Sequence, residues 1–194
     1  MNLYNKDFCD KGIHRTMFRE ELHKKKLVSL LNPKKEDKIL EIGCNQGRFV
    51  KHLRNYSNSV IGCDVNKDAL SSTTVKDLHF MSAEQLKFKD NSFDKVVSSH
   101  TIEHIPNVKK AINEMERILK PQGKCVLVYP FEIVRGMNNF FWAWRTYGNP
   151  LMSRKLHLHK LNPGKLDKMT KMKKLDGGLF LGPWPTYYTV FMKI

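Results

Sequence analysis

The sequence has few cysteines and no long apolar run. Its 194 residues contain four cysteines, none in a CxxC pair, and three of them fall in or beside predicted strands. That usage favours reduced thiols in a cytosolic protein over a disulfide framework or a metal site. No apolar run is long enough to span a bilayer, and the N-terminus is too charged for a signal peptide. We therefore expect a cytoplasmic protein without a transmembrane segment; the cysteines are Cys9, Cys44, Cys63 and Cys125.

Acidic residues are also scarce. The chain has 19 Asp and Glu against 34 Lys and Arg, a formal net charge of +15. Such an excess favours an anionic partner, either nucleic acid, an anionic membrane surface or a phosphorylated substrate. It is equally compatible with lysines that only keep the protein soluble. Charge informs association rather than fold, so both interpretations stay open.

Apolar segments alternate between strand and helix patterns from residue 38 to residue 130. A chain of this length predicts a single domain, 1–194, and this alternation predicts βαβ units with a mostly parallel sheet. The end of the chain, from Gly178 to Ile194, predicts two further strands around the sequence Gly-Pro-Trp-Pro. The predicted strands cover 38–42, 59–64, 78–81, 93–99 and 124–130, and the predicted helices cover 47–56, 67–74 and 108–119.

The central motif is Glu-Ile-Gly-Cys-Asn-Gln-Gly, residues 41–47. It predicts a strand, a tight glycine loop and a helix, the place where open α/β sheets bind nucleotide-like ligands. The spacing is not the Gly-x-Gly-x-x-Gly of dinucleotide sites. Glu41 inside the strand would repel a pyrophosphate and suits a cationic ligand. An ordinary strand-to-helix turn is the alternative for this loop alone.

A second acid, Asp64, ends the next predicted strand, and there it can accept hydrogen bonds from ribose hydroxyls. A helix N-cap role for Asp64 or for the nearby Asn66 is the alternative. Two further segments follow strands: Ser-Ala-Glu-Gln-Leu at 82–86, leading into Phe-Lys-Asp-Asn-Ser-Phe-Asp, and Ser-Ser-His-Thr-Ile-Glu-His at 98–104.

Together these segments resemble the class I S-adenosylmethionine (SAM)-dependent methyltransferases, close to the small-molecule, ubiquinone-type and sterol-type family. The resemblance spans Ile39 to Pro130 and departs from the family at Asn45, which replaces a glycine, and at Ser82, which replaces an acid. It implies a Rossmann-like α/β fold: a seven-stranded, mostly parallel sheet with helices on both faces and a C-terminal antiparallel hairpin. The cofactor-binding residues it implies are Glu41, Gly43, Cys44, Asn45, Gly47, Phe49, Asp64, Val65, Ser82, Ala83, Glu84, Ser98, Ser99 and His100.

The implied reaction transfers a methyl group from SAM to an oxygen or nitrogen acceptor and leaves S-adenosylhomocysteine. We expect a small-molecule acceptor, anionic or lipid-linked. The alternatives are an RNA methyltransferase, or an RNA- or partner-binding module on the same scaffold. The Asn/Asp-Pro-Pro-Tyr motif of DNA amino-methylating enzymes is absent after the fourth predicted strand, where residues 98–100 are Ser-Ser-His.

Two flanking regions complete the organisation. Residues 1–38 predict a helical lid, or a helix that covers the sheet without touching ligand. Residues 131–176, first aromatic and then basic, predict an acceptor-side insertion.

His104 is a candidate proton acceptor, with loop ordering as the alternative. His157 and His159 would share one face of a strand, but no carboxylate or cysteine partner lies nearby in the sequence, so the pair indicates a basic lid segment and no metal site is expected.

Overall fold

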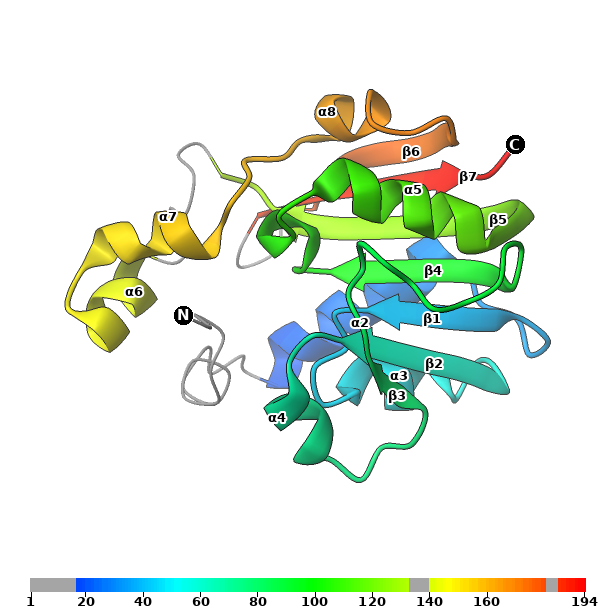
Figure 1. Cartoon of the computed structure of the whole chain (residues 1–194), viewed down its shortest axis with the longest axis horizontal. Helices are drawn as coiled ribbons and strands as arrows, with labels where there is room; N and C mark the ends of the chain where they lie inside the picture. Colours follow the sequence, from blue (N-terminus) through cyan, green and yellow to red (C-terminus); the bar gives the residue numbers. More distant parts are fainter. Residues whose placement is uncertain (1–16, 133–139, 181–184) are drawn as a thin grey trace.

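The computed structural model describes residues 17–132, 140–180 and 185–194 (Figure 1). Cys9, the first 16 residues of the predicted lid and the Gly182–Trp184 part of the predicted C-terminal turn lie outside these residues. Parts of the predicted 131–176 insertion also lie outside them.

Within the described residues, seven strands form one sheet in the order β3-β2-β1-β4-β5-β7-β6. The pairs from β3 through to β5 are parallel, while β7 runs antiparallel to both β5 and β6. This confirms the mostly parallel sheet and the closing antiparallel hairpin. The strands are β1 Lys38–Ile42, β2 Ser59–Asp64, β3 Leu78–Phe80, β4 Phe93–Ser99, β5 Leu119–Pro130, β6 Lys173–Phe180 and β7 Thr186–Met192.

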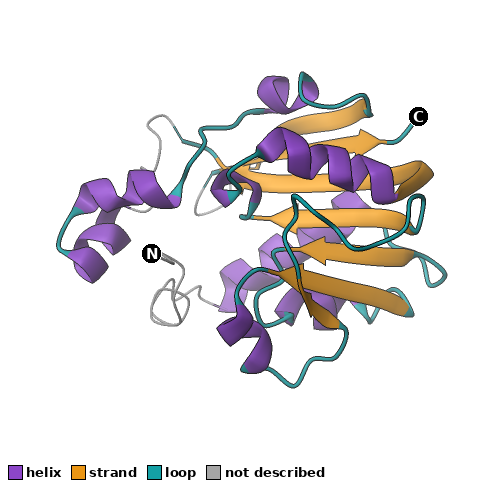
Figure 2. Cartoon of the chain, viewed as in Figure 1, coloured by secondary structure: helices purple, strands orange, loops and turns teal. Residues whose placement is uncertain are grey.

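Helices cover both faces of this sheet, as Figure 2 shows. In Figure 1, α5 lies in front of the sheet, and α2 and α3 lie behind it. The helices are α2 Met17–Leu31, α3 Arg48–Leu53, α4 Lys67–Ser71, α5 Val108–Ile118, α6 Phe140–Tyr147, α7 Ser153–Leu156 and α8 Pro163–Asp167, with 3₁₀ turns η1 Ile102–His104 and η3 Pro150–Met152.

The alternation of side chains along the strands divides the core into two layers. Leu40 and Ile42 of β1 pack into the cluster that holds the apolar face of α5. Ile39, one residue earlier, packs with Leu27 and Leu31 of α2 and with α3 on the opposite face. Glu41 alternates with Leu40 and Ile42, so it points to the α3 side of the sheet, which matters for the site described below.

Three strands differ from their predicted limits. β3 ends at Phe80, one residue before the predicted end at Met81. β6 begins at Lys173, inside the predicted 131–176 insertion, rather than at Gly178. Its first residues are lysines and other exposed side chains because β6 is the edge strand of the sheet, and charged edges hide the alternation that a buried strand would show. β5 begins at Leu119, and the predicted Pro-Gln-Gly turn lies within it as an irregularity of register against β4.

The helices α6 and α7 extend beyond the carboxyl ends of the strands (Figure 1). Phe141 and Trp144 of α6 are 60% and 59% exposed, and their rings lie 6.5 Å apart. Within the described part of the chain, none of the helices combines the length and the apolar character that a bilayer crossing needs.

Arg117 on α5 ties down the loop that leads from β3 to β4. Its guanidinium donates to the carbonyl oxygens of Leu86 and Phe88, each at 2.8 Å, and to both oxygens of Glu114. Glu114 in turn accepts the backbone N–H of Leu86 at 2.8 Å. These bonds hold the pKa of Glu114 below its ordinary value, chiefly through Arg117, with burial opposing them.

The lowered pKa of Glu114 predicts how the fold responds to acid. The carboxylate stabilises the native state above the unfolded pKa of about 4.3, and this stabilisation is lost as pH falls through the lower native pKa. Replacing Glu114→Gln should therefore lower the free energy of unfolding at pH 7 by about 1–2 kcal/mol, and the difference from the wild type should shrink below about pH 4. Urea denaturation from pH 7 to pH 3 measures it.

Glu36 is the matched control, since it is an exposed acid in the turn before β1. Glu36→Gln should change stability by less than about 0.5 kcal/mol at every pH. A Glu114→Gln deficit that stays constant down to pH 3 would contradict the ionic role of this carboxylate.

Candidate functional site

The loop between β1 and α3 has a left-handed backbone at alternate residues. The φ angles are +77° at Gly43, +48° at Asn45 and +73° at Gly47. Glycine adopts this region without a Cβ clash, and asparagine does so more readily than most residues. The asparagine that departs from the family pattern therefore occupies a position whose backbone it can adopt. Gly47 is the N-cap of α3, so the helix begins one residue later than predicted.

This loop is fastened to the end of β2. The backbone N–H groups of Gly43 and Cys44 both donate to the carbonyl oxygen of Cys63, at 2.8 and 3.1 Å. The Cys44 and Cys63 side chains are buried, and burial raises the pKa of Cys63 to about 12. Both thiols are therefore protonated packing groups. Cys44 takes part in the loop through its backbone.

Gly43 is also in close contact with the loop that follows β4. A Cβ atom at Gly43 would lie 2.0 Å from Thr101 Oγ1 and 2.4 Å from its methyl group. No side chain fits between the two loops at this point. The glycine is therefore required twice, by its backbone angle and by the approach of Thr101.

Glu41 lies beneath the loop and is only 6% exposed. Its carboxyl group accepts the backbone N–H of Val50, in the first turn of α3, while Gly47 supplies no side-chain cap. Burial raises the pKa of Glu41 well above its ordinary value; the Val50 N–H opposes this, and the nearby Asp64 adds to it. Its second oxygen, Oε2, is buried and has no hydrogen-bond partner within the described residues.

Asp64 ends β2 beside the same loop. One carboxylate oxygen accepts the N–H of Asn45 and the other accepts the N–H of Asn66, each at 2.8 Å. A carboxylate has about four acceptor positions, so two remain for ligand hydroxyls. The helix cap comes from Asn66, whose side chain accepts the N–H of Ala69 at 3.1 Å. The side chain of Val65, which lies between Asp64 and Asn66 in the sequence, is 60% exposed.

The segment after β3 forms another side of the site. Ser82 Oγ accepts the N–H of Glu84 at 3.1 Å, which closes a tight turn around Ala83. The Glu84 carboxylate accepts the N–H of Asn107 at 2.8 Å and so ties this turn to the start of α5. Ala83 is 8% exposed. Ser82 and Glu84 thus fix the backbone of a turn whose residues were predicted to bind the cofactor.

Three residues at the end of β4 complete the strand edge. Ser98 is buried and donates to the carbonyl oxygen of Ile42 at 3.1 Å. Ser99 Oγ lies 2.8 Å from His23 Nε2 of α2, so the N-terminal helix reaches this edge. His100 has a left-handed φ of +51°, and its N–H donates to the carbonyl oxygen of Val128.

The predicted residue Phe49 lies elsewhere. Its side chain is buried in the core layer between α3 and the sheet, and it stacks on His52 with ring centroids 6.0 Å apart. The remaining predicted cofactor residues gather on the loops at the carboxyl ends of β1 to β4.

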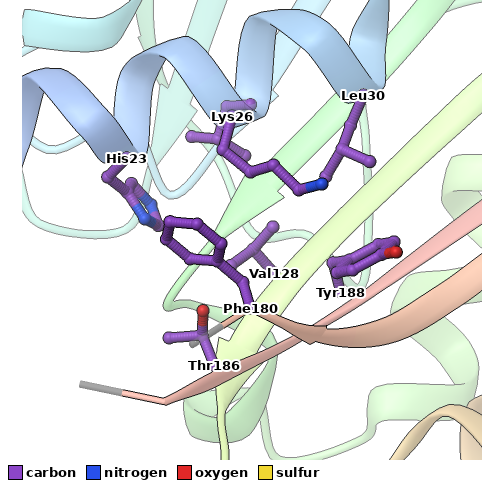
Figure 3. Close-up of a pocket in the computed structure, with 8 residues that line it drawn as sticks. His23, Lys26, Leu30, Val128, Phe180, Thr186 and Tyr188 are labelled. Atoms are coloured by element: carbon purple, nitrogen blue, oxygen red, sulfur yellow. The ribbon is translucent and has the colours of Figure 1, made fainter. Parts of the chain in front are cut away.

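The described surface also holds a small pocket between α2 and the β5–β7–β6 strands, where the Lys26 ammonium lies 4.8 Å from the centre of the Tyr188 ring (Figure 3).

His104 belongs to a buried cluster that the sequence did not reveal. His157 Nδ1 lies 2.7 Å from Glu132 Oε1, and its ring packs edge-on against His104 with centroids 4.9 Å apart. The prediction that His157 lacks a carboxylate partner is therefore wrong. Glu132 is 25 residues away in the sequence, and only the fold brings the two together. Glu103 lies beside them, and burial raises its pKa to about 7, with His157 acting in the opposite direction.

Comparison with known proteins agrees with this geometry. Residues 40–127 match the family model described as a methyltransferase domain. The ubiquinone/menaquinone biosynthesis C-methyltransferase UbiE of Rickettsia prowazekii is 27% identical over 157 residues, which cover 73% of this chain and 60% of UbiE. The chain spans 46% of the length of an uncharacterized protein of Methanocaldococcus jannaschii, to which it is 35% identical over 106 residues, and 60% of the length of UbiE.

Two solved structures share the fold across most of the chain. The YcgJ protein of Bacillus subtilis superposes with a TM-score of 0.70 at 16% identity, covering 89% of this chain and 98% of YcgJ. A SAM-dependent methyltransferase from Aquifex aeolicus gives a TM-score of 0.66 at 13% identity, covering 88% and 89%. Residues 40–127 thus match a methyltransferase domain, and the chain has the fold of these solved structures across most of its length.

The residues at this strand edge fit SAM, the cofactor that the resemblance implies. The left-handed loop approaches Thr101 so closely that a side chain at Gly43 would clash, which fixes the position of the loop at the edge of the site. Asp64 retains acceptor capacity for hydroxyl groups. The Asp64 carboxylate beside the loop disfavours a pyrophosphate, whereas a cationic sulfonium ligand is compatible with it and with the buried Glu41 carboxyl group.

The contact between Gly43 and Thr101 predicts the result of a single substitution. Gly43→Ala should weaken SAM binding by about tenfold or more, because the new methyl group forces the loop away from Thr101. Isothermal titration calorimetry measures the loss. The control is Gly148→Ala: Gly148 also has a positive φ, +66°, but no atom lies within 4 Å of its Cβ position. That variant carries only the backbone cost, about 1 kcal/mol of stability.

Equal SAM affinity in the wild type and in Gly43→Ala would show that the loop does not contact the cofactor.

Proposed function

We propose that this methyltransferase domain transfers the methyl group of SAM to an oxygen or nitrogen atom of a small, anionic or lipid-linked acceptor. The observation that carries the proposal is the pair of carboxyl groups, Glu41 and Asp64, at a left-handed loop on the carboxyl edge of the sheet. Parallel α/β sheets bind ligands at this edge. The net charge of +15 favours an anionic acceptor.

Each strand end has a proposed part in holding the cofactor. Asp64 accepts the ribose hydroxyls with the acceptor positions that Asn45 and Asn66 leave open. The turn at Ala83 holds the adenine through its backbone, and the loop from Gly43 to Gly47 holds the amino-acid part. When bound, SAM supplies an electrophilic methyl carbon and leaves as S-adenosylhomocysteine. The protein mainly aligns the two reactants and excludes water.

The acceptor is proposed to enter beside η1 and under the segment from 131 to 176. His104 lies on η1, immediately after the strand edge, and its side chain is 21% exposed. The predicted role of His104 is to take a proton from the acceptor. Helix α2 acts as part of the lid, which its His23–Ser99 contact at 2.8 Å supports.

Methylation of a carbon atom is a second candidate. It is supported by the similarity to UbiE of Rickettsia prowazekii, whose name describes a C-methyltransferase of ubiquinone and menaquinone biosynthesis. Oxygen and carbon acceptors share a requirement for an ionisable hydroxyl group when the carbon belongs to a phenolic ring. The position of the transferred methyl group in the product separates these candidates.

A transfer assay tests the proposal. The protein is incubated with cell extract and SAM that carries an isotopic label in its methyl group, and the products are separated and identified by mass spectrometry. We expect label in a small molecule. Asp64→Ala should abolish transfer and weaken SAM binding by about 100-fold, because two hydrogen bonds to a charged acceptor are lost.

Asp68 provides the control, since it is an exposed acid on α4, four residues further on. Asp68→Ala should retain transfer. Label in RNA alone, with binding that weakens steeply as salt rises, would instead support the RNA methyltransferase. Absence of SAM binding would reject the enzyme and leave a binding module on the same scaffold.

The exposed aromatic residues of α6 give a separate prediction. Exchanging Phe141→Ser and Trp144→Ser together should raise KM for the acceptor by about tenfold and leave SAM affinity unchanged, because both rings are exposed on the helix that extends beyond the strand edge. Steady-state kinetics and calorimetry measure the two quantities. A lower SAM affinity with a native circular dichroism spectrum would place α6 on the cofactor side instead.

A further inference from the structure

A cluster of buried acids and histidines lies beside the proposed cofactor site. Glu103 and His104 belong to η1, immediately after β4, while Glu132 follows β5 and His157 follows α7. Glu103, Glu132 and His157 are 2%, 5% and 3% exposed. Three segments far apart in the sequence therefore place four chemically active side chains together in the interior.

The backbone keeps these segments in register. The N–H groups of Leu158 and His159 both donate to the carbonyl oxygen of Glu103, at 2.9 and 3.2 Å. His159 Nε2 also lies 2.9 Å from the carbonyl oxygen of Ile105. The two residues after His157 are thus attached to η1 and to the residue that follows it. The position of this segment does not depend on the cluster's side chains alone.

The Glu103 carboxyl group lacks hydrogen bonds within the described residues. Both of its oxygens are buried and neither has a hydrogen-bond partner within the described residues. The nearest basic atoms are His104 Nε2 at 3.6 Å and His100 Nδ1 at 3.8 Å, too far for a hydrogen bond. A buried carboxyl group without partners is costly, so this position favours a group that can bind both oxygens.

His157 has the arrangement of a metal-binding histidine. Its Nδ1 lies 2.7 Å from the Glu132 carboxylate, a hydrogen bond that favours the tautomer with the proton on Nδ1 and makes Nε2 the metal-binding nitrogen of the ring. Histidines that bind metals usually donate their second N–H to a carboxylate or carbonyl in this way. Glu132 therefore orients His157 toward the other members of the cluster.

We propose that Glu103, His104 and His157 bind one divalent transition-metal ion of the zinc type. One ligand atom from each of the three residues lies within 4.8 Å of the others. Ligand atoms about 2.1 Å from a tetrahedral zinc ion lie about 3.4 Å apart, so the side chains must close by up to about 1.4 Å to bind it. Two imidazoles and one carboxylate favour zinc, iron or cobalt over magnesium and calcium, which prefer oxygen ligands.

Three protein ligands leave a coordination position open, as in catalytic zinc sites. The cluster follows the strand edge at Ser98 to His100, and the loop that carries it touches Gly43 through Thr101. An acceptor oxygen on the ion would therefore lie on the acceptor side of the proposed site. This role rests on the proposed methyl transfer, whereas ion binding itself does not. With the ion bound, His104 Nε2 is a ligand and holds the acceptor indirectly, in place of taking its proton.

Titration with Co²⁺ and Zn²⁺ tests the site. The full chain is stripped with a chelator and titrated with each ion, by visible absorption for Co²⁺ and by calorimetry for Zn²⁺. We expect one ion per chain. Glu103→Gln and His157→Gln should each weaken binding by about 100-fold, and Glu132→Gln by about 10- to 100-fold, the range for residues that orient a ligand.

His79→Gln is the matched control, since His79 is an exposed histidine on β3. It should bind the ions as the wild type does. Melting temperatures without metal check the fold: a site variant that melts like the wild type but no longer gains stability from Zn²⁺ supports the site. Ion binding that is absent from the wild type, or unchanged in Glu103→Gln and His157→Gln, would overturn it.

SAM binding by the same samples separates this proposal from the proposed function. A chain that binds SAM but no ion keeps its methyltransferase role and loses the metal site. A chain that binds one ion through Glu103 and His157 but not SAM keeps the metal site, and the proposed methyl transfer fails.

Discussion

The fixed position of the loop after β1 is the constraint on which the rest of the structure depends. Its backbone is left-handed at alternate residues, and the Asp64 carboxylate holds it through the N–H of Asn45 at 2.8 Å. The Thr101 contact leaves no room for a side chain at Gly43. These contacts join the ends of β1, β2 and β4, so the carboxyl edge of the sheet presents backbone groups and carboxylates in one place.

Glu41 connects this edge to the core. Because side chains alternate along β1, Glu41 points to the α3 side, where its carboxyl group accepts the Val50 N–H and replaces a conventional cap. The same residue was predicted from its place in the motif to act on the ligand. The structure adds a second role, which is to fix the start of the helix that follows the loop. Because Glu41 is buried, its carboxyl group helps to hold the loop and the start of α3 in place below the site.

Local patterns in the sequence predicted most of the fold. The alternation along β1, β2 and β4 and the apolar spacing of α5 follow directly from burial on two faces. The start of β6 was harder to predict, because an edge strand with exposed lysines lacks that alternation. The limits of α3 and β5 depended on a glycine cap and on an irregular register, which no short pattern specifies.

The candidate site likewise contains residues that the sequence predicted and residues that it did not. The loop, Asp64 and the Ser82 and Ser98 segments were predicted because each follows a strand, and parallel strands end at one edge. The cluster around Glu103 was missed because its members come from three segments, and Glu132 meets His157 only after the chain has folded. A histidine in a basic segment gives no local signal of a buried partner. Contacts between distant segments are the part that pattern and spacing do not encode.

The central claim is that the acids and the left-handed loop select an adenosyl sulfonium over an anionic dinucleotide. Calorimetric titration of the wild-type chain with SAM, S-adenosylhomocysteine and NAD tests it most directly. The account predicts one site with a dissociation constant on the order of micromolar for SAM and for S-adenosylhomocysteine, and no saturable binding of NAD. Saturable binding of NAD together with none of SAM would contradict it.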